Sequence, residues 1–363
     1  MLATTSWLDP GGAGRGGPVG PVTVRFSGRR AGGTGTLGSR DRFEVEETVD
    51  RLLPGSGPVS VTAKVTDVTP GEWLVHGRVL APPGQPQAAR PIAVPDAGGP
   101  LHPLRRRLWP RGNPLAPDGS AVTARTRLAP VATGPGIVPA SWAAAVAAGV
   151  ALAVVLLAVL LGRVGADVPR ALAVSAAIIA GGMIGARLWY VMLQRGKAEG
   201  LWVRGLCIQG TIAGGALVAV PALLLAGIGV GTFFDAAAPG LFYAMAVGRQ
   251  GCFLAGCCTG RPTASRFGIW SSDGRVGVRR VPAQQLEALV SALLGTGALL
   301  AFLALGTAPG GAVFAGTLAA YVAARQPLLA ARAEPRRWRL AAPVTLAVAL
   351  AALAADIAVA VLG

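Results

Sequence analysis

The sequence has little charge and almost no histidine, and each shortage excludes a class of protein or of chemistry. Charged residues make up 14% of the 363 residues and hydrophobic residues 52%, whereas soluble globular domains carry about 25% charged residues. An ordinary soluble fold is therefore excluded for the chain as a whole. The two histidines, His76 and His102, both lie in the first third of the chain. The later apolar segments therefore supply no histidine base or metal ligand of their own.

Cysteine is absent before Cys207, which excludes a disulfide-stapled N-terminal domain. The other three cysteines, Cys252, Cys257 and Cys258, are close in sequence, but their spacing differs from the CxxC-like pairs of structural zinc sites. We therefore favour apolar packing for these thiols over a redox or disulfide pair and over a metal site. The sequence predicts no metal and no cofactor.

Repeated carboxylates are also absent from the apolar segments, which argues against an ion transporter or channel. The formal net charge is +16, and such a balance attracts nucleic acid or anionic lipid. Most basic residues of the second half lie between long apolar runs. We therefore expect the lipid bilayer and its headgroups as partners, and no nucleic acid.

The first 138 residues divide by composition into three parts. Residues 1–20 are rich in Gly and Pro, which predicts a disordered tail without a signal peptide. Residues 21–80 alternate polar and apolar side chains, as in Val59–Val65, which predicts a small β-rich soluble domain. Residues 81–138 are rich in Pro, Gly and Arg and are interpreted as a solvated linker. The alternative is a basic strap on anionic lipid through Arg105–Arg107.

Long apolar runs fill residues 139–363. A transmembrane helix needs about 20 apolar residues to cross about 30 Å of hydrocarbon, and a helix satisfies every backbone group within the span. We therefore predict an all-α membrane domain of about seven transmembrane helices. The runs are Ala140–Gly162, Ala171–Met192, Leu206–Val230, Ala236–Ala255, Leu286–Leu305, Gly310–Ala324 and Ala341–Leu362.

The loops of this bundle differ in charge from one side to the other. Basic loops at Arg195–Arg204, Arg261–Arg280 and Arg325–Arg339 fall on the same side as the N-terminal domain. The positive-inside tendency predicts that this side is cytoplasmic.

Three polar segments interrupt the apolar runs and are candidates for chemistry. They are Gly185-Ala-Arg-Leu-Trp-Tyr190, Ile208-Gln-Gly-Thr-Ile-Ala-Gly-Gly215 and Gly248-Arg-Gln-Gly-Cys-Phe-Leu-Ala-Gly-Cys-Cys-Thr-Gly-Arg-Pro262. An arginine at membrane depth usually faces a cavity or a partner. The fork of Arg249 suits two phosphate oxygens, with a snorkelling interfacial arginine as the alternative. Glycines such as Gly210 allow helices to approach closely.

The third segment resembles the signature of the bacterial prolipoprotein diacylglyceryl transferase family, Gly-Arg-x-Gly-Asn-Phe-x-Asn-Gly-Glu-x-x-Gly, in a variant with Cys-Phe and Gly-Cys-Cys. Further motifs are similar to those of the family in order and spacing over about residues 140–362. They are Gly185–Tyr190, Gln209–Gly214, Pro282-Ala-Gln-Gln-Leu-Glu287 and Tyr321-x-x-x-Arg325. Residues 1–135 have no counterpart in the family.

The resemblance implies a multi-pass enzyme of the inner (plasma) membrane. Such an enzyme moves diacylglyceryl from phosphatidylglycerol to the lipobox cysteine thiol of a preprolipoprotein, and glycerol phosphate leaves. That reaction needs a cationic clamp on the phosphate and a means of forming the thiolate. By resemblance, the catalytic residues are Arg249, Arg325 and Gln209. The substrate-binding residues by resemblance are Arg187, Tyr190, Gly210, Gly251, Cys252, Cys257, Gly260, Gln284 and Glu287.

Several positions depart from the family pattern. Gln209 stands where the family has His, Cys252 where it has Asn, and Cys257 where it has Glu, while Leu329 replaces a carboxylate expected after Arg325. Glutamine cannot act as a base. Either the arginines alone favour the thiolate, or the chain is a non-catalytic phospholipid-binding paralogue. A third interpretation is a transferase with another acceptor that uses the vicinal cysteine pair.

The resemblance also bears on orientation. The family keeps its N-terminus outside the cytoplasm, opposite to the prediction from loop charge. We follow the family topology, because the matching order of the spans is more specific than a charge bias.

Overall fold

A computed structural model describes residues 1–11, 20–32, 38–80, 89–93, 113–128, 133–193, 205, 207–308, 310–333 and 343–352. These residues form two compact units, each of which contains segments that are distant in sequence. The first unit comprises Met1–Val146, Gly248–Ala288 and Pro327–Arg337. The second comprises Ala147–Val247, Leu289–Gln326 and Trp338–Gly363.

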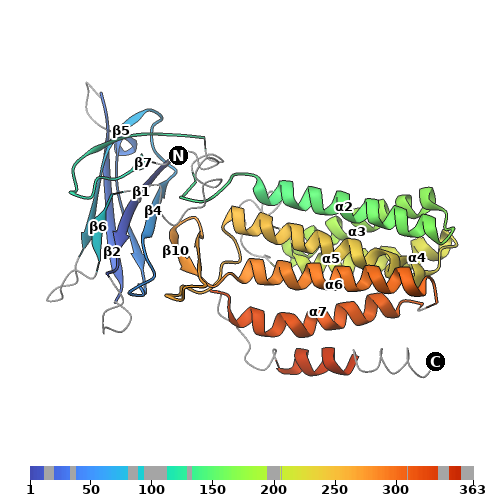
Figure 1. The fold of residues 1–363 in the computed structure, drawn as a ribbon. Coiled ribbons are helices and arrows are strands. Elements are labelled where there is room, and N and C mark those ends of the chain that lie inside the picture. The colour runs from blue at the N-terminus through green and yellow to red at the C-terminus, as the bar shows by residue number, and fades with distance from the viewer. Residues whose placement is uncertain are drawn as a thin grey trace. The chain divides into compact units, whose positions relative to one another are not determined.

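Two β-sheets dominate the first unit (Figure 1). The larger has the order β6-β1-β4-β10-β9, and β7 pairs with β1; the smaller has the order β3-β2-β5-β8. The strands of the larger sheet are β1 (Leu2–Asp9), β4 (Val59–Val65), β6 (Arg90–Ile92), β7 (Asn113–Pro114), β9 (Ile269–Ser272) and β10 (Val276–Arg280). Those of the smaller are β2 (Val22–Arg30), β3 (Arg42–Val49), β5 (Glu72–Leu80) and β8 (Val122–Arg125), with a short 3-10 helix, η1 (Ser39–Asp41).

The two sheets share one hydrophobic core. Leu8 and Val61 enter it from the larger sheet, while Phe26 and Trp73 enter it from the smaller. Burial alternates along β2, with one face against the core and the other toward solvent, as expected for a half-buried strand. The predicted β-rich N-terminal region is confirmed.

The boundaries predicted for this region are wrong in two places. Leu2–Asp9 is not part of a disordered tail but forms β1, in which all residues except the last are buried. Because both faces of β1 are covered, the strand lacks the polar–apolar alternation by which exposed strands are recognised. The predicted linker over 81–138 likewise contributes β6, β7 and β8. His102, Arg105–Arg107 and Arg195–Arg204 lie outside the described residues.

The hairpin of β9 and β10 belongs to the same sheet as the N-terminal strands. Val276 and Gly277 of β10 lie opposite Val61 and Ser60 of β4 in an antiparallel pair. One hydrogen-bonded sheet must lie on one side of a bilayer, because open sheet edges are not tolerated within hydrocarbon. The N-terminal domain and the loop that carries this hairpin therefore share a side of the membrane, which both the charge bias and the family topology predicted.

Side-chain contacts fix this junction between distant parts of the sequence. The rings of Trp7 and Trp270 stack with centroids 5.7 Å apart, and the Trp270 indole N–H donates to the Pro58 carbonyl at 2.9 Å. Arg275 forms an ion pair with Glu47 of β3, so the hairpin also contacts the smaller sheet.

Long apolar helices follow the β-domain: α2 (Ser141–Arg163), α3 (Val168–Leu193), α4 (Ile208–Leu225), α5 (Val230–Ala255), α6 (Ala283–Leu305) and α7 (Ala312–Ala330). The helices α2 to α6 are long and apolar enough to cross a membrane, and only 22–39% of their most apolar windows is buried within the protein. The apolar remainder suits contact with lipid tails. The chain is therefore a multi-pass membrane protein.

Five of the seven predicted spans are supported among the described residues. The helix α7 occupies the sixth apolar run, and Pro343–Ala352 forms a shorter apolar helix within the seventh run. Membrane crossing by these last two segments stays a prediction.

Candidate functional site

The glycine- and cysteine-rich signature begins in the last turns of α5. Gly251 lies where α5 passes α2, and a Cβ there would come within 2.5 Å of the Ala145 Cβ. Cβ atoms essentially never approach so closely, so only glycine lets the two helices meet at this point. Arg249 lies two residues before Gly251 on the same helix.

An ion-pair triad joins α5, α6 and the segment after α7. The Nε atom of Arg249 lies 2.6 Å from Oε2 of Glu287. The same carboxylate accepts two hydrogen bonds from Arg332, Nε to Oε1 at 3.0 Å and Nη2 to Oε2 at 2.8 Å. Glu287 is 1% exposed and the Arg249 side chain 16%. A buried carboxylate requires nearby positive charge, which the two arginines supply. Glu287 in turn fixes the orientation of Arg249, whose guanidinium stays partly accessible.

The loop after α5 folds back over the start of α6. Gly256 has φ +76°, and a Cβ there would lie 2.3 Å from Ile137 Cδ1. Cys258 has φ +54°, a left-handed conformation unusual for a residue other than Gly, Asn or Asp. The amide Nε2 of Gln284, in the first turn of α6, donates to the Cys257 carbonyl at 3.0 Å. Gln284 is therefore a positioning residue for this loop.

The end of the signature runs between two other backbone segments. Gly260 is bridged antiparallel to Arg332, and a Cβ on Gly260 would lie 2.0 Å from the Val281 carbonyl oxygen. The side chain of Arg280, 4% exposed, donates to the Gly260 carbonyl at 3.2 Å and to Asp273 at 2.9 Å. Burial lowers the pKa of Arg280, although the negative charge of Asp273 partly offsets this effect by raising the pKa. Arg280 thereby links the hairpin of β9 and β10 to the end of the signature segment.

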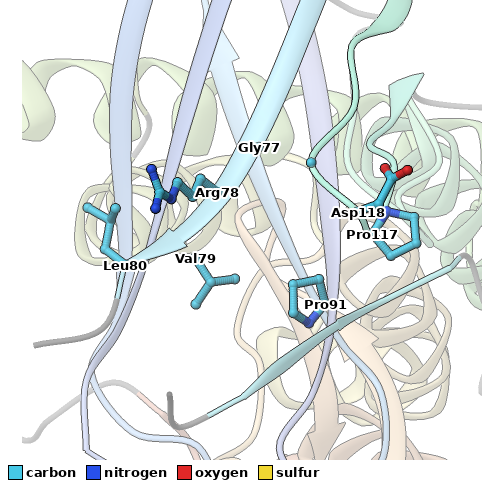
Figure 2. A pocket seen from close by; sticks show the side chains of 8 residues that line it. Gly77, Arg78, Val79, Leu80, Pro91, Pro117 and Asp118 are labelled. Carbon is cyan, nitrogen blue, oxygen red and sulfur yellow. The ribbon is translucent and has the colours of Figure 1, made fainter. Parts of the chain in front are cut away.

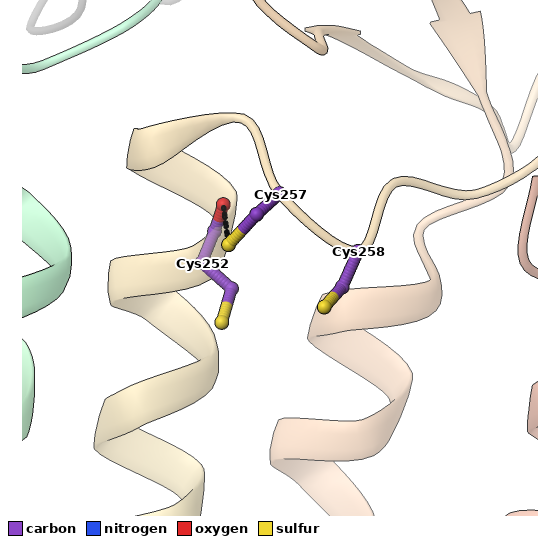
Figure 3. Close-up of side chains that lie close together, drawn as sticks. All are labelled: Cys252, Cys257 and Cys258. Atoms are coloured by element: carbon purple, nitrogen blue, oxygen red, sulfur yellow. Dashed lines mark hydrogen bonds between the residues drawn. The ribbon is translucent and has the colours of Figure 1, made fainter. Parts of the chain in front are cut away.

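Three thiols meet where α5 ends (Figure 3). The sulfur atoms of Cys252, Cys257 and Cys258 all lie within 4.8 Å of one another, and the Cys257 thiol also contacts the Cys252 carbonyl oxygen at 3.7 Å. Cys252 is buried, whereas Cys257 is exposed. The expectation of apolar packing therefore suits Cys252 but is wrong for Cys257.

The thiols and arginines of this cluster are electrostatically linked. Hydrogen bonds from the Cys252 and Cys257 thiols lower the pKa of Cys258, as do the positive charges of Arg332 and Arg249. Hydrogen bonding to Cys252 and Cys258 raises the pKa of Cys257. The site therefore favours negative charge on sulfur at Cys258.

The second unit holds the other candidate residues. Arg187 on α3 donates through Nη1 to the Gly205 carbonyl at 2.9 Å, and its buried Nη2 has no hydrogen-bond partner among the described residues. The ring of Tyr190 lies against Gly205, where a Cβ would come within 2.3 Å of it. An unsatisfied buried guanidinium N–H is costly, and a bound anion would satisfy it.

Gln209 and Gly210 lie at the start of α4. The Cys207 thiol donates to the Gln209 amide oxygen at 2.6 Å. A Cβ on Gly210 would lie 2.2 Å from the Gly185 carbonyl oxygen of α3. The prediction that Gly210 allows close helix packing is confirmed.

Arg325 lies on α7 over the ring of Tyr321, with its guanidinium carbon 6.0 Å from the ring centroid. Its buried Nε and the Tyr321 hydroxyl have no hydrogen-bond partner in the described parts of the chain. This pair therefore presents unsatisfied donors of the kind that bind phosphate oxygens.

The structure gathers seven of the predicted residues in the first unit: Arg249, Gly251, Cys252, Cys257, Gly260, Gln284 and Glu287. The other five, Arg187, Tyr190, Gln209, Gly210 and Arg325, lie in the second unit. Sequence reasoning missed Arg332, which belongs to no recognised motif. The signal that could have found Arg332 was Glu287 itself. A glutamate buried in an apolar helix needs a cation as its partner, and the basic segment after α7 can supply one.

A separate hollow of about 510 Å³ lies in the β-domain (Figure 2). It is lined by Gly77–Leu80 of β5, by Pro91 of β6 and by Pro117–Gly119. No signature residue lines it.

Comparison with known proteins matches the chain to one family. A family model described as prolipoprotein diacylglyceryl transferase matches residues 131–362. Phosphatidylglycerol–prolipoprotein diacylglyceryl transferase of Mycobacteroides abscessus is 36% identical over 113 residues, 27% of this chain and 33% of that protein. The protein of the same name from Frankia alni is 37% identical over 98 residues, 24% of this chain and 26% of that protein.

A third relative comes from Clostridium perfringens and is named phosphatidylglycerol–prolipoprotein diacylglyceryl transferase 2. It is 38% identical over 94 residues, 25% of this chain and 37% of that protein. The matches thus span between 26% and 37% of the lengths of these curated relatives. The family model begins at residue 131, after the strands β1 to β8, and includes the hairpin of β9 and β10.

Proposed function

Because the chain belongs to the prolipoprotein diacylglyceryl transferase family, we propose that it moves diacylglyceryl from phosphatidylglycerol to the cysteine thiol of a preprolipoprotein. We place it in the plasma membrane, where both substrates reside. The observation that carries the proposal is the buried ion pair between Arg249 and Glu287 inside the signature segment. This ion pair holds the partly accessible guanidinium of Arg249 within the segment that resembles the family's motif.

The arginines have the chemistry that the leaving group requires. As the bond from glyceryl carbon to phosphate oxygen breaks, negative charge grows on the phosphate, and donors fixed in advance stabilise it. Arg249 is fixed by Glu287, while Arg187 and Arg325 carry buried N–H groups without partners among the described residues. These three arginines are the proposed phosphate-binding residues, and the family resemblance assigns Arg249 and Arg325 to the phosphate clamp.

The roles of the remaining predicted residues follow from their contacts. Gly251 and Gly260 permit close backbone approach, and Gln284 holds the Cys257 carbonyl. Tyr190 packs against Gly205, and Arg187 donates to the carbonyl of the same residue. Gln209 can hydrogen-bond a headgroup but cannot take a proton.

The test is an assay with phosphatidylglycerol vesicles and a lipobox peptide, with the thioether product measured by mass spectrometry. Arg249→Ala should lower the rate about 10- to 150-fold, because a hydrogen bond to a charged group contributes about 1.5–3 kcal/mol. Arg249→Lys should recover only part of the rate, since it keeps the charge without the fork. Arg163→Ala, an exposed arginine at the end of α2, is the matched control and should leave the rate unchanged.

A second candidate function rests on Gln209, which stands where the family has His. A non-catalytic phospholipid-binding protein would bind phosphatidylglycerol, lose that binding in Arg249→Ala, and form no thioether. If wild type is inactive while Gln209→His forms product, the scaffold is competent and only the base is missing. If neither forms product from correctly inserted protein, the transferase proposal fails.

A further inference from the structure

We propose that Cys252, Cys257 and Cys258 bind a zinc ion through three thiolates, and that its fourth position binds the acceptor thiol. The role in catalysis rests on the proposed function, but the metal site itself does not. Four-coordinate zinc with zinc–sulfur distances of about 2.3 Å places neighbouring sulfur atoms about 3.8 Å apart. The three sulfur atoms lie within 4.8 Å of one another, so small rotations of the side chains close the site.

The backbone holds the thiols in this arrangement. Cys252 lies on the rigid end of α5, and the loop brings Cys257 and Cys258 back beside it (Figure 3). Cys258 adopts a left-handed φ of +54°, a conformation that costs energy for most side chains and persists where surrounding contacts require it. Gln284 fixes the intervening backbone through the Cys257 carbonyl. The convergence of the thiols is therefore built into the loop.

The surrounding charge matches a zinc ion with three thiolates. Zinc with three thiolates carries a charge of −1, whereas Arg249 and Arg332 together with Glu287 carry +1. The site as a whole is then neutral, which removes most of the penalty for burying its ions. A disulfide would leave this positive charge uncompensated and would use only two of the three thiols.

An open fourth position is the mark of a catalytic zinc site. Cys252 is buried while Cys257 is exposed, so the cluster is closed on one side and accessible on the other. A thiol that coordinates zinc is deprotonated outright. Zinc would thereby convert the acceptor thiol to a thiolate. Gln209 cannot do so, because a glutamine side chain cannot act as a base.

The acceptor cysteine of the peptide binds zinc as its thiolate, and the thiol proton passes to solvent. The sulfur attacks the glyceryl carbon that bears the phosphate oxygen, so that a carbon–sulfur bond forms and the carbon–oxygen bond breaks. Glycerol phosphate leaves with the electron pair of the broken bond, and the arginines stabilise its charge.

The first experiment measures metal in protein purified from zinc-supplemented medium. We expect one zinc ion per chain by mass spectrometry of metals, and a thiolate-to-metal charge-transfer band after exchange with Co²⁺. Cys257→Ser and Cys258→Asn should lose the metal, and asparagine is chosen because it tolerates the left-handed conformation. Cys207→Ser removes a thiol outside the cluster and should retain full occupancy. Chromatography and thermal unfolding of each variant show that it folds.

The outcomes separate the metal site from the proposed function. Zinc binding without transfer activity would support the site and count against the transferase. Transfer by metal-free protein that a chelator does not inhibit would overturn the catalytic role of zinc. Wild-type protein that takes up neither Zn²⁺ nor Co²⁺, or that carries a disulfide within the cluster under reducing conditions, would overturn the site altogether.

Discussion

Replacing Glu287 by glutamine should destabilise the first unit strongly, although the two side chains have nearly the same shape. Glu287 binds Arg332 through both of its oxygens and also lies 2.6 Å from Arg249. In either orientation, the glutamine amide would turn its NH₂ group toward an arginine donor. Removing one partner of a buried ion pair costs about 3–5 kcal/mol. For a cooperative unit of 150–250 residues, that cost lowers the unfolding temperature by roughly 6–20 °C.

Arg332→Gln should be less harmful, because Glu287 then keeps the nearby charge of Arg249. The exposed pair of Arg40 and Asp67 provides the control, with side chains 70% and 78% exposed. Asp67→Asn should cost less than about 1 kcal/mol, because solvent screens the pair. The three variants thus form an ordered series.

The assay is thermal unfolding of purified protein in detergent, followed by tryptophan fluorescence at constant ionic strength. High salt should shrink the effect of Asp67→Asn but leave that of Glu287→Gln, since buried pairs are screened less. An unfolding temperature of Glu287→Gln within about 2 °C of wild type would refute a stabilising role for the buried carboxylate. A larger loss of stability in Arg332→Gln would also refute it, because the carboxylate would then not be the centre of the triad.

Three further predictions concern packing and capping, and each is checked by the same unfolding assay. Gly210→Ala should cost about 1–3 kcal/mol by pushing α4 from α3, whereas Gly297→Ala on α6, with no atom within 4 Å of its added Cβ, should be neutral or stabilising. Asp235→Asn should cost about 0.5–2 kcal/mol, because the carboxylate accepts the Gly311 and Phe314 backbone N–H groups at 2.7 and 2.9 Å where α7 begins. Trp270→Ala should cost about 3–5 kcal/mol and should accelerate amide exchange in β10, since it removes the stack on the N-terminal domain; unchanged exchange would contradict the shared sheet.

The membrane domain was the most predictable part of the chain. Runs of about 20 apolar residues predict spanning helices whatever their neighbours, and each of the helices α2 to α6 overlaps one of the predicted runs. Arg249 and Glu287 were each recognisable from the sequence, because each lies in a segment that resembles the family, but their ion pair is a finding of the structure. The ends of the β-domain were not readable, since β1 is covered on both faces and shows no alternation.

The partners of the site were harder to predict than its members. Arg332 reaches Glu287 from a turn beyond α7, 45 residues away in sequence, and no local pattern reports such a contact. The meeting of the three thiols depends on the left-handed backbone of Cys258. Spacing along the chain does not reveal a reversal of that kind, and the sequence alone therefore favours ordinary packing for these thiols.

The sheet that joins β4 to β10 has a consequence for how the protein is made. Pro58 and Trp270, which meet in the finished sheet, are 212 residues apart. At synthesis rates of 5–20 residues per second, the later residue emerges from the ribosome roughly 10–40 s after the earlier one. During that interval β4, with its Val-rich sequence, is an unpaired edge of the kind that pairs with foreign strands. Assembly of the β-domain must therefore wait for the fourth long helix to be inserted, so a ribosome that stalls before the hairpin would leave a half-built sheet as a target for chaperones and proteases.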